Sequence, residues 1–323
     1  MKRLRRFPIT NKSDLIYAKI EIGHYFEDPH EREIYLYASM ELGSNIIKHS
    51  GSNGELWLLE QNGFLSIVAC DRGVGIGNIE LALQEGYSTF IESSLGIGLS
   101  SLCKLDNYDL EVFSLTKHNL HGSVVFFGKK TQQKQTVCLS IPFDDNYNGD
   151  FVASKGRLIA FGDVAGHGQK AFSTALEVIS FFNRHCHSIL TIEDFFKSLH
   201  NNLLENDLRG CDLIIAAVDS NKVTVTGVGN ITMWMKNNGE FISSSIRSGS
   251  VGTHYSKLTH QTFELTLSSP LIITTDGVSK DCFKNLSDTI KKDNIKASLC
   301  AALYFCGSLS DDASIIYFKA KDL

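Results

Sequence analysis

The pattern of hydrophobic and polar positions changes character near residue 130. Before it, residues Glu31–His49 combine helix formers with apolar side chains at helical spacing, and Gly51 and Gly54 interrupt this pattern. A second, shorter helix is expected over 99–105. Four strand-like runs accompany these helices, so the pattern predicts helices over one face of an antiparallel or mixed sheet. The expected strands are 56–59, 64–70, 109–115 and 122–127.

The polar segment Lys129–Lys134 has no apolar periodicity, and a new strand-like run follows it. We therefore expect a domain boundary there, with one domain over 1–130 and another over 131–323. Beyond the boundary, two helices over 169–183 and 192–204 interrupt many strands, which predicts a sheet-rich core covered by helices. The expected strands of this second part are 136–141, 158–161, 213–218, 223–228, 231–235, 271–275 and 314–318.

Composition narrows the class of protein. The chain has 323 residues, 43% of them hydrophobic, and a formal net charge of -5. This length allows two domains with separate cores, and the charge does not favour nucleic acid or an anionic membrane surface. Eight cysteines without a C-x-x-C pair indicate neither a disulfide framework nor a thiolate zinc site, so we expect reduced thiols. The start, MKRLRR, is interpreted as a frayed, solvated end, and a cytoplasmic location is expected.

Within the first predicted helix, Glu41 and Asn45 are four residues apart and share a face. A carboxylate and a carboxamide one turn apart suit phosphoryl transfer, because the amide oxygen can bind Mg²⁺ while the carboxylate accepts a proton from the attacking group. Such pairs are also frequent on solvated helix faces. This pair alone therefore does not distinguish the two interpretations.

Glycine-rich segments follow this helix. Asp71, at the end of a predicted strand, can accept a hydrogen bond from an exocyclic amine, while Gly73 and Gly75 allow a ligand to approach the backbone closely. Gly96 and Gly98 directly precede the second predicted helix, where free N–H groups can bind phosphate oxygens. Each segment alone is also consistent with an ordinary turn or a tightly packed helix start.

Taken in order, the segments ELGSNIIKH, DRGVGIG and SSLGIGLS resemble the GHKL-type ATP-binding fold. The resemblance is to the small serine/threonine kinases of bacterial partner switching, the RsbW- and RsbT-like anti-sigma regulators, and it covers about residues 10–128, including a closing H-G-S-V-V segment. It implies an α/β sandwich that binds ATP and Mg²⁺, with Glu41 as catalytic base, Asn45 as Mg²⁺ ligand and Asp71 as adenine contact. It also implies that Gly73, Gly75, Gly96 and Gly98 surround the nucleotide.

A second set of carboxylates lies at the strand ends and turns of the second part. These are Asp150, Asp163, Asp276 and the pair Asp311–Asp312. Each stands beside a glycine or at the end of an apolar run, where carboxylates from different strands can converge. Hard oxygen donors suit Mg²⁺ or Mn²⁺ rather than zinc. For any one of them, a turn or a solvated loop is the alternative.

The motifs NGDF, GDVAGHG, TTDG and DDAS resemble the SpoIIE- and RsbX-like branch of the metal-dependent PPM-type serine/threonine phosphatases. The resemblance covers most of 132–323 and implies an αββα sandwich with two Mg²⁺ or Mn²⁺ ions between its sheets. It implies that Asp163 binds both ions, that Asp150 binds one and Asp276 and Asp311 the other, and that Val164 contributes its carbonyl.

Together, the two resemblances predict a bifunctional switch enzyme that phosphorylates and dephosphorylates a serine or threonine of a STAS-domain partner. A phosphatase whose first domain senses ATP or docks the substrate is one alternative, and a non-enzymatic module that sequesters a sigma factor is another. Because both activities running at once would only consume ATP, we expect a signal or the state of the partner to favour one of them. The sequence is compatible with a dimer but identifies no dimer surface.

Overall fold

The computed structural model describes residues 4–51, 54–61, 64–86, 98–116, 120–130, 136–143, 147–188, 191–237, 240–266, 268–290, 292–308 and 310–320. The chain forms two compact units. The first comprises Met1–Gln132 and Thr289–Phe305, and the second comprises Gln133–Asp288 and Cys306–Leu323. The predicted division at residue 130 assigned all of 131–323 to the second domain, whereas Thr289–Phe305 packs with the first unit.

The first unit is built on one sheet of five antiparallel strands in the order β1-β2-β3-β5-β4. The strands are β1 (Leu4–Ile9), β2 (Gly54–Gln61), β3 (Phe64–Asp71), β4 (Tyr108–Leu115) and β5 (Gly122–Lys129). The helices are α1 (Lys12–Gly23), α2 (Pro29–His49), α3 (Ile79–Ala82), α4 (Gly98–Cys103) and α8 (Ile295–Cys306), with a 3₁₀ turn, η1 (Lys292–Asn294), before α8. The two helices and four strands predicted for this part are confirmed, with small shifts at their ends.

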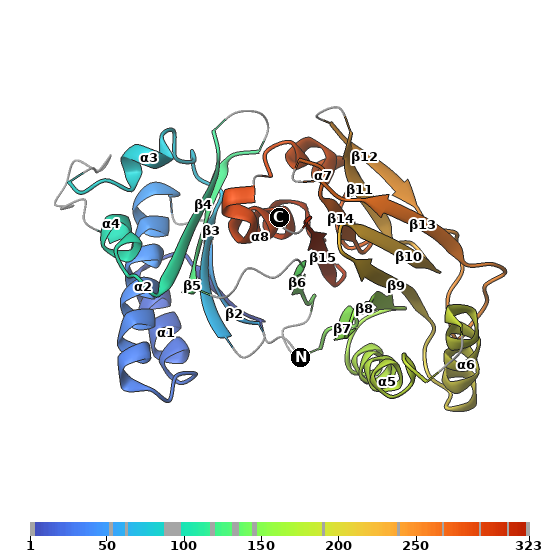
Figure 1. Ribbon diagram of the computed structural model, residues 1–323. Helices are drawn as coiled ribbons and strands as arrows, with labels where there is room; N and C mark the ends of the chain where they lie inside the picture. The colour runs from blue at the N-terminus through green and yellow to red at the C-terminus, as the bar shows by residue number, and fades with distance from the viewer. Residues whose placement is uncertain are drawn as a thin grey trace. The chain divides into compact units, whose positions relative to one another are not determined.

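Helices cover both faces of this sheet, not one face as the sequence predicted. On the face of α1 and α2, Leu42 packs with Leu56 and Phe127 in a buried core. On the opposite face lies α8 (Figure 1), where Trp57, the neighbour of Leu56 on β2, meets the ring of Tyr304. Every position of β5 except its last is buried, as a strand covered on both faces requires.

The start of the chain differs from the expected frayed end. β1 pairs with β2 along its whole length. Phe7 and Ile9 are buried in the core, whereas Arg6 points to the other face and forms two hydrogen bonds with the Glu55 carboxylate, at 2.9 and 2.8 Å. Such alternation is typical of a strand with one apolar face in the core. The many charged residues of the segment made this strand difficult to predict from the sequence.

The second unit contains two antiparallel sheets of five strands, with the orders β13-β10-β9-β8-β7 and β12-β11-β14-β15-β6. The first sheet consists of β7 (Phe151–Lys155), β8 (Leu158–Val164), β9 (Cys211–Asp219), β10 (Lys222–Val228) and β13 (Thr259–Glu264). The second consists of β6 (Thr136–Ile141), β11 (Thr232–Asn237), β12 (Glu240–Ser245), β14 (Leu271–Thr274) and β15 (Ala313–Phe318). Phe161 and Ile214 of the first sheet share a buried core with Met233, Ile273 and Ile316 of the second.

Three helices cover the outer faces of these sheets. α5 (Gln169–His185) and α6 (Ile192–Glu205) pack on the first sheet, where Val178 and Leu199 are fully buried with Leu213. α7 (Lys280–Ser287) packs on the second sheet, since the ring of Phe283 lies 4.9 Å from that of Trp234. The order of layers is therefore helix, sheet, sheet, helix, as the sequence predicted for this part.

A disulfide joins Cys282 of α7 to Cys306, with the two Cα atoms 5.4 Å apart. The expectation that all thiols are reduced is therefore wrong for this pair. The two cysteines are 24 residues apart, and only the path of the chain through α7 and α8 brings them together. Local spacing gave no signal for this contact.

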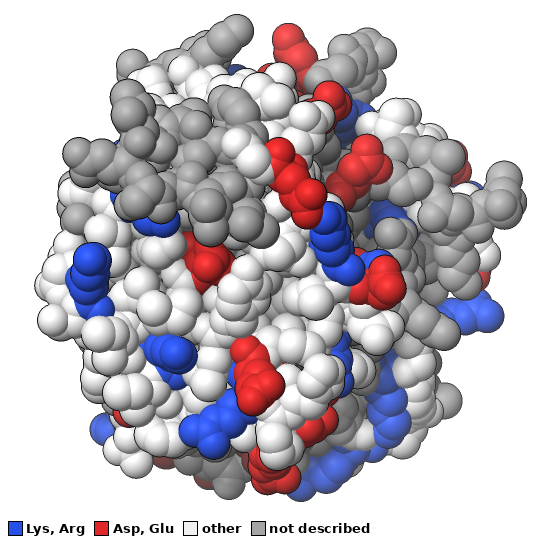
Figure 2. Space-filling model, turned by 90° about the vertical axis from the view of Figure 1, so that its left-hand side faces the viewer, with Lys and Arg blue, Asp and Glu red and all other residues white. Residues whose placement is uncertain are grey.

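The surface of the first unit that faces the viewer in Figure 2 carries Lys and Arg side chains among Asp and Glu side chains. Within its described part, no extended area of one sign is visible. Among the described helices, none is both long and apolar enough to cross a membrane.

Candidate functional sites

Glu41 and Asn45 lie one turn apart on α2, and both are partly buried. α2 begins where the Asp28 side chain accepts a hydrogen bond from the N–H of His30. The start of α4 lies against Glu41, because a Cβ atom at Gly98 would come within 2.4 Å of Glu41 Oε2. The structure thus brings Glu41, Asn45 and Gly98 into one neighbourhood. Gly96 lies outside the described residues.

Asp71 ends β3, and two donors hold its carboxylate. Oδ1 accepts a hydrogen bond from the N–H of Gly73 at 2.8 Å, and Oδ2 accepts one from the Ser123 hydroxyl. Ser123 lies directly opposite Asp71 on β5. It was not among the predicted site residues, although its place in the closing H-G-S-V-V segment was a usable signal. Since a carboxylate offers about four acceptor sites, Asp71 can still bind a further donor.

The glycines after Asp71 are required by the packing of their own loop. A Cβ atom at Gly73 would come within 2.8 Å of the Ser50 Cα, and one at Gly75 within 2.3 Å of the Leu115 carbonyl oxygen. Gly75 also has a φ of 74°, which favours glycine. These two predicted nucleotide residues therefore have a structural role whether or not a ligand binds beside them.

The predicted metal ligands lie at the ends of neighbouring strands in the second unit. Asp150 directly precedes β7, and Asp163 lies near the end of β8, the neighbour of β7 in one sheet. Asp276 follows β14, and Asp311 precedes β15, the neighbour of β14 in the other sheet. Because the two sheets face each other, these strand ends bring the four carboxylates toward one place.

Asp150 is a buried acid, and Asp163 is partly buried. Asp150 is 6% exposed; its Oδ2 accepts a hydrogen bond from the Thr275 hydroxyl at 3.0 Å, while its Oδ1 has no hydrogen-bond partner among the described residues. Burial raises the pKa of Asp150 well above its ordinary value. Burial also raises the pKa of Asp163, and the negative charges of Asp150, Asp276 and Asp311 raise it further. A group whose neighbours disfavour its charge so strongly is suited to bind a cation.

Two residues that the sequence did not single out connect to these acids. Asp212 lies opposite Asp163 in the pairing of β8 with β9, and burial raises the pKa of Asp212 to about 6. The backbone N–H of Asn230 donates to Asp212 at 2.6 Å, and its side-chain amide donates to Asp276 Oδ2 at 3.1 Å. Asn230 therefore connects Asp212 to Asp276. In the sequence, the only indication of Asn230 was its position just after the apolar run 223–228.

The two adjacent acids of the closing motif have different roles. Asp312 is 1% exposed, and its carboxylate accepts hydrogen bonds from the backbone N–H groups of Phe143 at 2.7 Å and Gly149 at 2.6 Å. Asp311 is more exposed, and its Oδ1 accepts from the N–H of Asp312 at 3.0 Å. Asp312 is thus almost completely buried and held by the backbone, whereas Asp311 is more exposed and is the more accessible candidate ligand of the pair.

Val164 follows Asp163 and is fully buried, and its N–H donates to the Gly149 carbonyl at 3.3 Å. This bond ties the strand of Asp163 to the segment of Asp150. The next residue, Ala165, is held by Arg209, whose guanidinium donates to the Ala165 carbonyl at 2.9 Å. At Gly166 a Cβ atom would come within 2.6 Å of the same guanidinium. The turn after Val164 is therefore fixed on both sides.

The donor set fits a divalent cation with a preference for hard oxygen ligands. Among the described residues, no three His, Cys, Asp or Glu side chains are gathered closely enough to enclose an ion in this conformation. Asp150 nevertheless has a buried oxygen without a hydrogen-bond partner among the described residues, and the charges of three other carboxylates raise the pKa of Asp163. A cation would offset both costs. Hydrogen bonds from Thr275 and Asn230 hold two of the acids meanwhile.

Comparison with known proteins matches a large part of the chain to one family. The family model described as Stage II sporulation protein E (SpoIIE) matches residues 154–320. The match contains Asp163, Asp276 and Asp311, begins four residues after Asp150, and does not extend into the sheet of the first unit. No curated protein matches the chain in sequence.

Several solved structures are similar to this chain at low identity. One contains the PP2C phosphatase domain and a fragment of the regulatory domain of SpoIIE from Bacillus subtilis (14% identity, 95% of each chain covered, TM-score 0.49). Another is RsbX in complex with magnesium (18% identity, 56% of this chain and 92% of that chain, TM-score 0.46). A third is the catalytic domain of the phosphatase PstP with two manganese ions (15% identity, 58% and 98%, TM-score 0.46). The assignment to a family rests on the sequence match over residues 154–320 and not on these likenesses.

Proposed function

Because the chain belongs to the Stage II sporulation protein E (SpoIIE) family, we propose that its second unit is a metal-dependent phosphatase of phosphorylated serine or threonine side chains. The observation that carries this proposal is the gathering of Asp150, Asp276 and Asp311 near the partly buried Asp163 at the ends of facing strands, where burial and their charges raise the pKa of Asp163. Such a concentration of negative charge is costly unless cations bind there.

In this proposal, Asp163 would bind two Mg²⁺ or Mn²⁺ ions, Asp150 would bind one of them, Asp276 and Asp311 would bind the other, and the Val164 carbonyl would contribute. Two such ions polarise the phosphoryl group and lower the pKa of a bound water. The chain's own residues keep the acids in place. Thr275 donates to Asp150, and Asn230 donates to Asp276. The substrate class is a protein that carries phosphoserine or phosphothreonine, and the STAS-domain partner stays a prediction.

For the first unit, we propose an adenine nucleotide site. Asp71 would accept the exocyclic amine of the base, because Ser123 and Gly73 hold its carboxylate at the strand end. Glu41 and Asn45 lie together on α2, where the amide could bind a Mg²⁺ ion that accompanies the phosphates. We favour a nucleotide-sensing role for this unit. Helix α8 belongs to the segment that matches the family, yet it packs on one face of the sheet of the first unit and so connects the two parts of the chain.

A kinase activity is the second candidate for the first unit. Its supporting observation is that Glu41 is only partly buried, lies beside Gly98 and is one turn from Asn45. A carboxylate in that position could accept the proton of an attacking serine hydroxyl. The two candidates differ in one respect: a sensor binds ATP without transferring phosphate, whereas a kinase labels the partner.

The phosphatase proposal is tested by phosphate release from a phosphoserine peptide, with the full chain and Mn²⁺. We expect Asp163→Asn to lower the rate by at least about a hundredfold. Asp219→Asn, an exposed acid on β9, is the matched control and should keep the wild-type rate. Equal rates for wild type and Asp163→Asn would contradict the proposal. Transfer of labelled phosphate from ATP to a partner, lost in Glu41→Gln and kept in the exposed Glu33→Gln, would establish the kinase candidate.

A further inference from the structure

The segment that contains α8 belongs to one unit by packing and to the other by sequence. In the sequence this segment lies between the two candidate ligands Asp276 and Asp311, yet it packs with the sheet of the first unit. Residues 297–303 are buried at every position. A helix that is buried all round is an integral part of a core rather than a surface attachment.

The beginning of α8 is anchored to β4. Glu111 Oε2 accepts hydrogen bonds from the N–H groups of Lys296 at 2.7 Å and Ala297 at 3.1 Å. The Lys296 ammonium forms a salt bridge with Asp109 at 2.8 Å. Just before the helix, the side-chain amide of Asn294 donates to the Val112 carbonyl at 2.8 Å. These bonds fix the first turn of α8 on the sheet.

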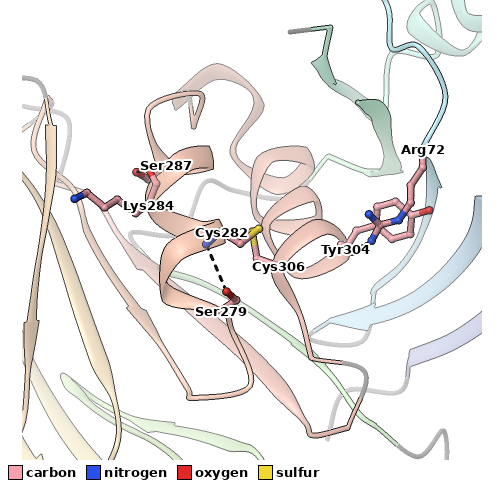
Figure 3. The surroundings of a disulfide bond; sticks show 7 residues. All are labelled: Arg72, Ser279, Cys282, Lys284, Ser287, Tyr304 and Cys306. Carbon is pink, nitrogen blue, oxygen red and sulfur yellow. Dashed lines mark hydrogen bonds between the residues drawn. A yellow bond between two sulfur atoms is a disulfide. The ribbon is translucent and has the colours of Figure 1, made fainter. Parts of the chain in front are cut away.

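The end of α8 is held by Arg72, the residue directly after Asp71. The Arg72 guanidinium donates to the Tyr304 carbonyl at 3.1 Å. It also lies over the rings of Tyr304 and Phe305, 5.0 and 5.4 Å from their centroids. Figure 3 shows Arg72 extending alongside Tyr304. A stacked, hydrogen-bonded arginine is a specific contact that lysine cannot fully replace.

The two ends of the α7–α8 segment are joined in the second unit, next to the candidate ligands. The N–H of Ser308 donates to the Gly277 carbonyl at 2.7 Å, and Val278 pairs with Gly307. The N–H of Ser279 donates to the Cys306 carbonyl at 2.8 Å. The disulfide of Cys306 with Cys282, also shown in Figure 3, joins the two ends of this segment covalently. Gly277 is adjacent to Asp276, and Ser308 is three residues before Asp311.

We propose that Arg72 is a positioning residue of the phosphatase centre, through which a nucleotide at Asp71 changes the placement of Asp276 and Asp311. Successive residues at a strand end point in opposite directions, so Asp71 meets Ser123 while Arg72 reaches the end of α8. A ligand that draws Asp71 and Gly73 toward itself displaces Arg72. Tyr304 then moves with Arg72, and so do the joined ends of the α7–α8 segment. The inference rests on the nucleotide site proposed above for the first unit.

This arrangement requires reciprocal coupling. If bound nucleotide favours one placement of the acids, then metal bound to the acids must alter the affinity for nucleotide by the same factor. Removal of the Arg72 contacts should abolish the coupling without abolishing either binding event. Substitution of a residue that only stabilises the fold would weaken both nucleotide binding and metal binding. It would leave the effect of each ligand on the other unchanged.

The test uses the full chain with a non-hydrolysable ATP analogue and with Mn²⁺ in excess over the nucleotide. Phosphate release from a phosphoserine peptide is measured with and without the analogue for wild type, Arg72→Ala, Arg72→Lys and Arg157→Ala. Arg157, an exposed arginine paired with Asp219, is the matched control. We expect the analogue to change the rate about fivefold or more in wild type and in Arg157→Ala. The ratio should fall to about one in Arg72→Ala and lie between these values in Arg72→Lys.

A second readout does not depend on activity. Hydrogen exchange of residues 276–279, 306–308 and 310–312 should change when the analogue binds to wild type, and should not change in Arg72→Ala, although the variant still binds the analogue. If Arg72→Ala does not fold, Arg72→Lys decides in both assays. An unchanged nucleotide effect in the Arg72 variants, or no nucleotide effect in wild type, overturns the inference. If no peptide phosphate is released but hydrogen exchange responds, the phosphatase proposal fails while the coupling stands.

Discussion

The carboxylate of Asp312 accepts a hydrogen bond from the backbone N–H of Gly149, 2.6 Å away, although 163 positions separate the two residues. The bond joins the closing acid pair to the segment that carries Asp150. The same carboxylate also accepts from the N–H of Phe143. The strand ends that present the candidate ligands are therefore held together by a carboxylate that is almost completely buried.

This arrangement predicts opposite effects for the two adjacent acids. Asp312→Ala leaves two backbone N–H groups without their charged acceptor, so it should lower the free energy of unfolding by about 2–4 kcal/mol. Asp311→Ala should change that free energy by less than about 1 kcal/mol and instead weaken Mn²⁺ binding. Urea unfolding and calorimetric Mn²⁺ titration of both variants measure these effects. Equal losses of stability in the two variants would contradict the division of roles.

The stability of the metal-free protein should depend on pH through three acids that are buried or partly buried. Burial raises the pKa of Asp212 from 3.8 to about 6, and the pKa values of Asp150 and Asp163 are also raised. An acid with a raised pKa binds its proton more tightly in the folded state than in the unfolded state. Its contribution to stability is therefore fully present below about pH 4 and is lost as the pH rises through the pKa of the folded state. We expect a melting temperature several degrees lower at pH 8 than at pH 5.

Two additions make this prediction specific. Asp163→Asn removes one raised acid, so the fall in melting temperature with pH should be smaller in this variant. Added Mn²⁺ binds the charged acids of the folded state, so at pH 8 it should raise the melting temperature of wild type and have less effect on Asp163→Asn. The idea fails if wild type and the variant show the same pH dependence.

The local pattern predicted the elements that carry their own signal. α2 and the strands β2 to β5 follow helical or strand spacing over whole elements, and Asp163 and Asp276 stand at visible strand ends. α8 was missed because residues 297–303 are apolar except for Ser298, and such a helix shows no amphipathic period. Its partners, Glu111 and Arg72, lie about 180 to 230 residues earlier in the chain, as the separations of 185 and 232 show.

The site was predicted in part for the same reason. The candidate acids are recognisable because each stands beside a glycine or a strand end, but the residues that hold them are identified only by the fold. Nothing near Asn230 in the sequence indicates that it contacts both Asp212 and Asp276. Likewise, the sequence does not distinguish Asp311 from Asp312, because only the positions of Phe143 and Gly149 separate their roles.

Asn230 should affect metal binding without being a ligand. Asn230→Ala keeps the backbone bond to Asp212 but removes the amide that orients Asp276, so we expect Mn²⁺ affinity to fall about tenfold. Asn201→Ala, an exposed asparagine on α6, is the matched control and should bind Mn²⁺ like wild type. Calorimetric titration measures both. An affinity within about twofold of wild type would show that Asp276 is positioned without Asn230.

Ser123 offers the corresponding test of the first unit. Its hydroxyl donates to Asp71 Oδ2, so Ser123→Ala removes one of the two protein bonds that orient this carboxylate. We expect the affinity for a fluorescent ATP analogue to fall about tenfold, the size of one hydrogen bond to a charged group. Ser66→Ala, a buried serine on β3 of the same sheet, is the matched control for loss of a buried hydroxyl.

Thermal melts accompany the titrations and separate orientation from stability. If Ser123→Ala binds the analogue as tightly as wild type while Asp71→Asn does not bind it, Asp71 contacts the nucleotide without help from Ser123. If neither variant changes the affinity, the analogue binds elsewhere and the proposed contact between Asp71 and the base is wrong. The coupling through Arg72 would then lose its starting point, because Arg72 follows Asp71 directly and was proposed to move with it.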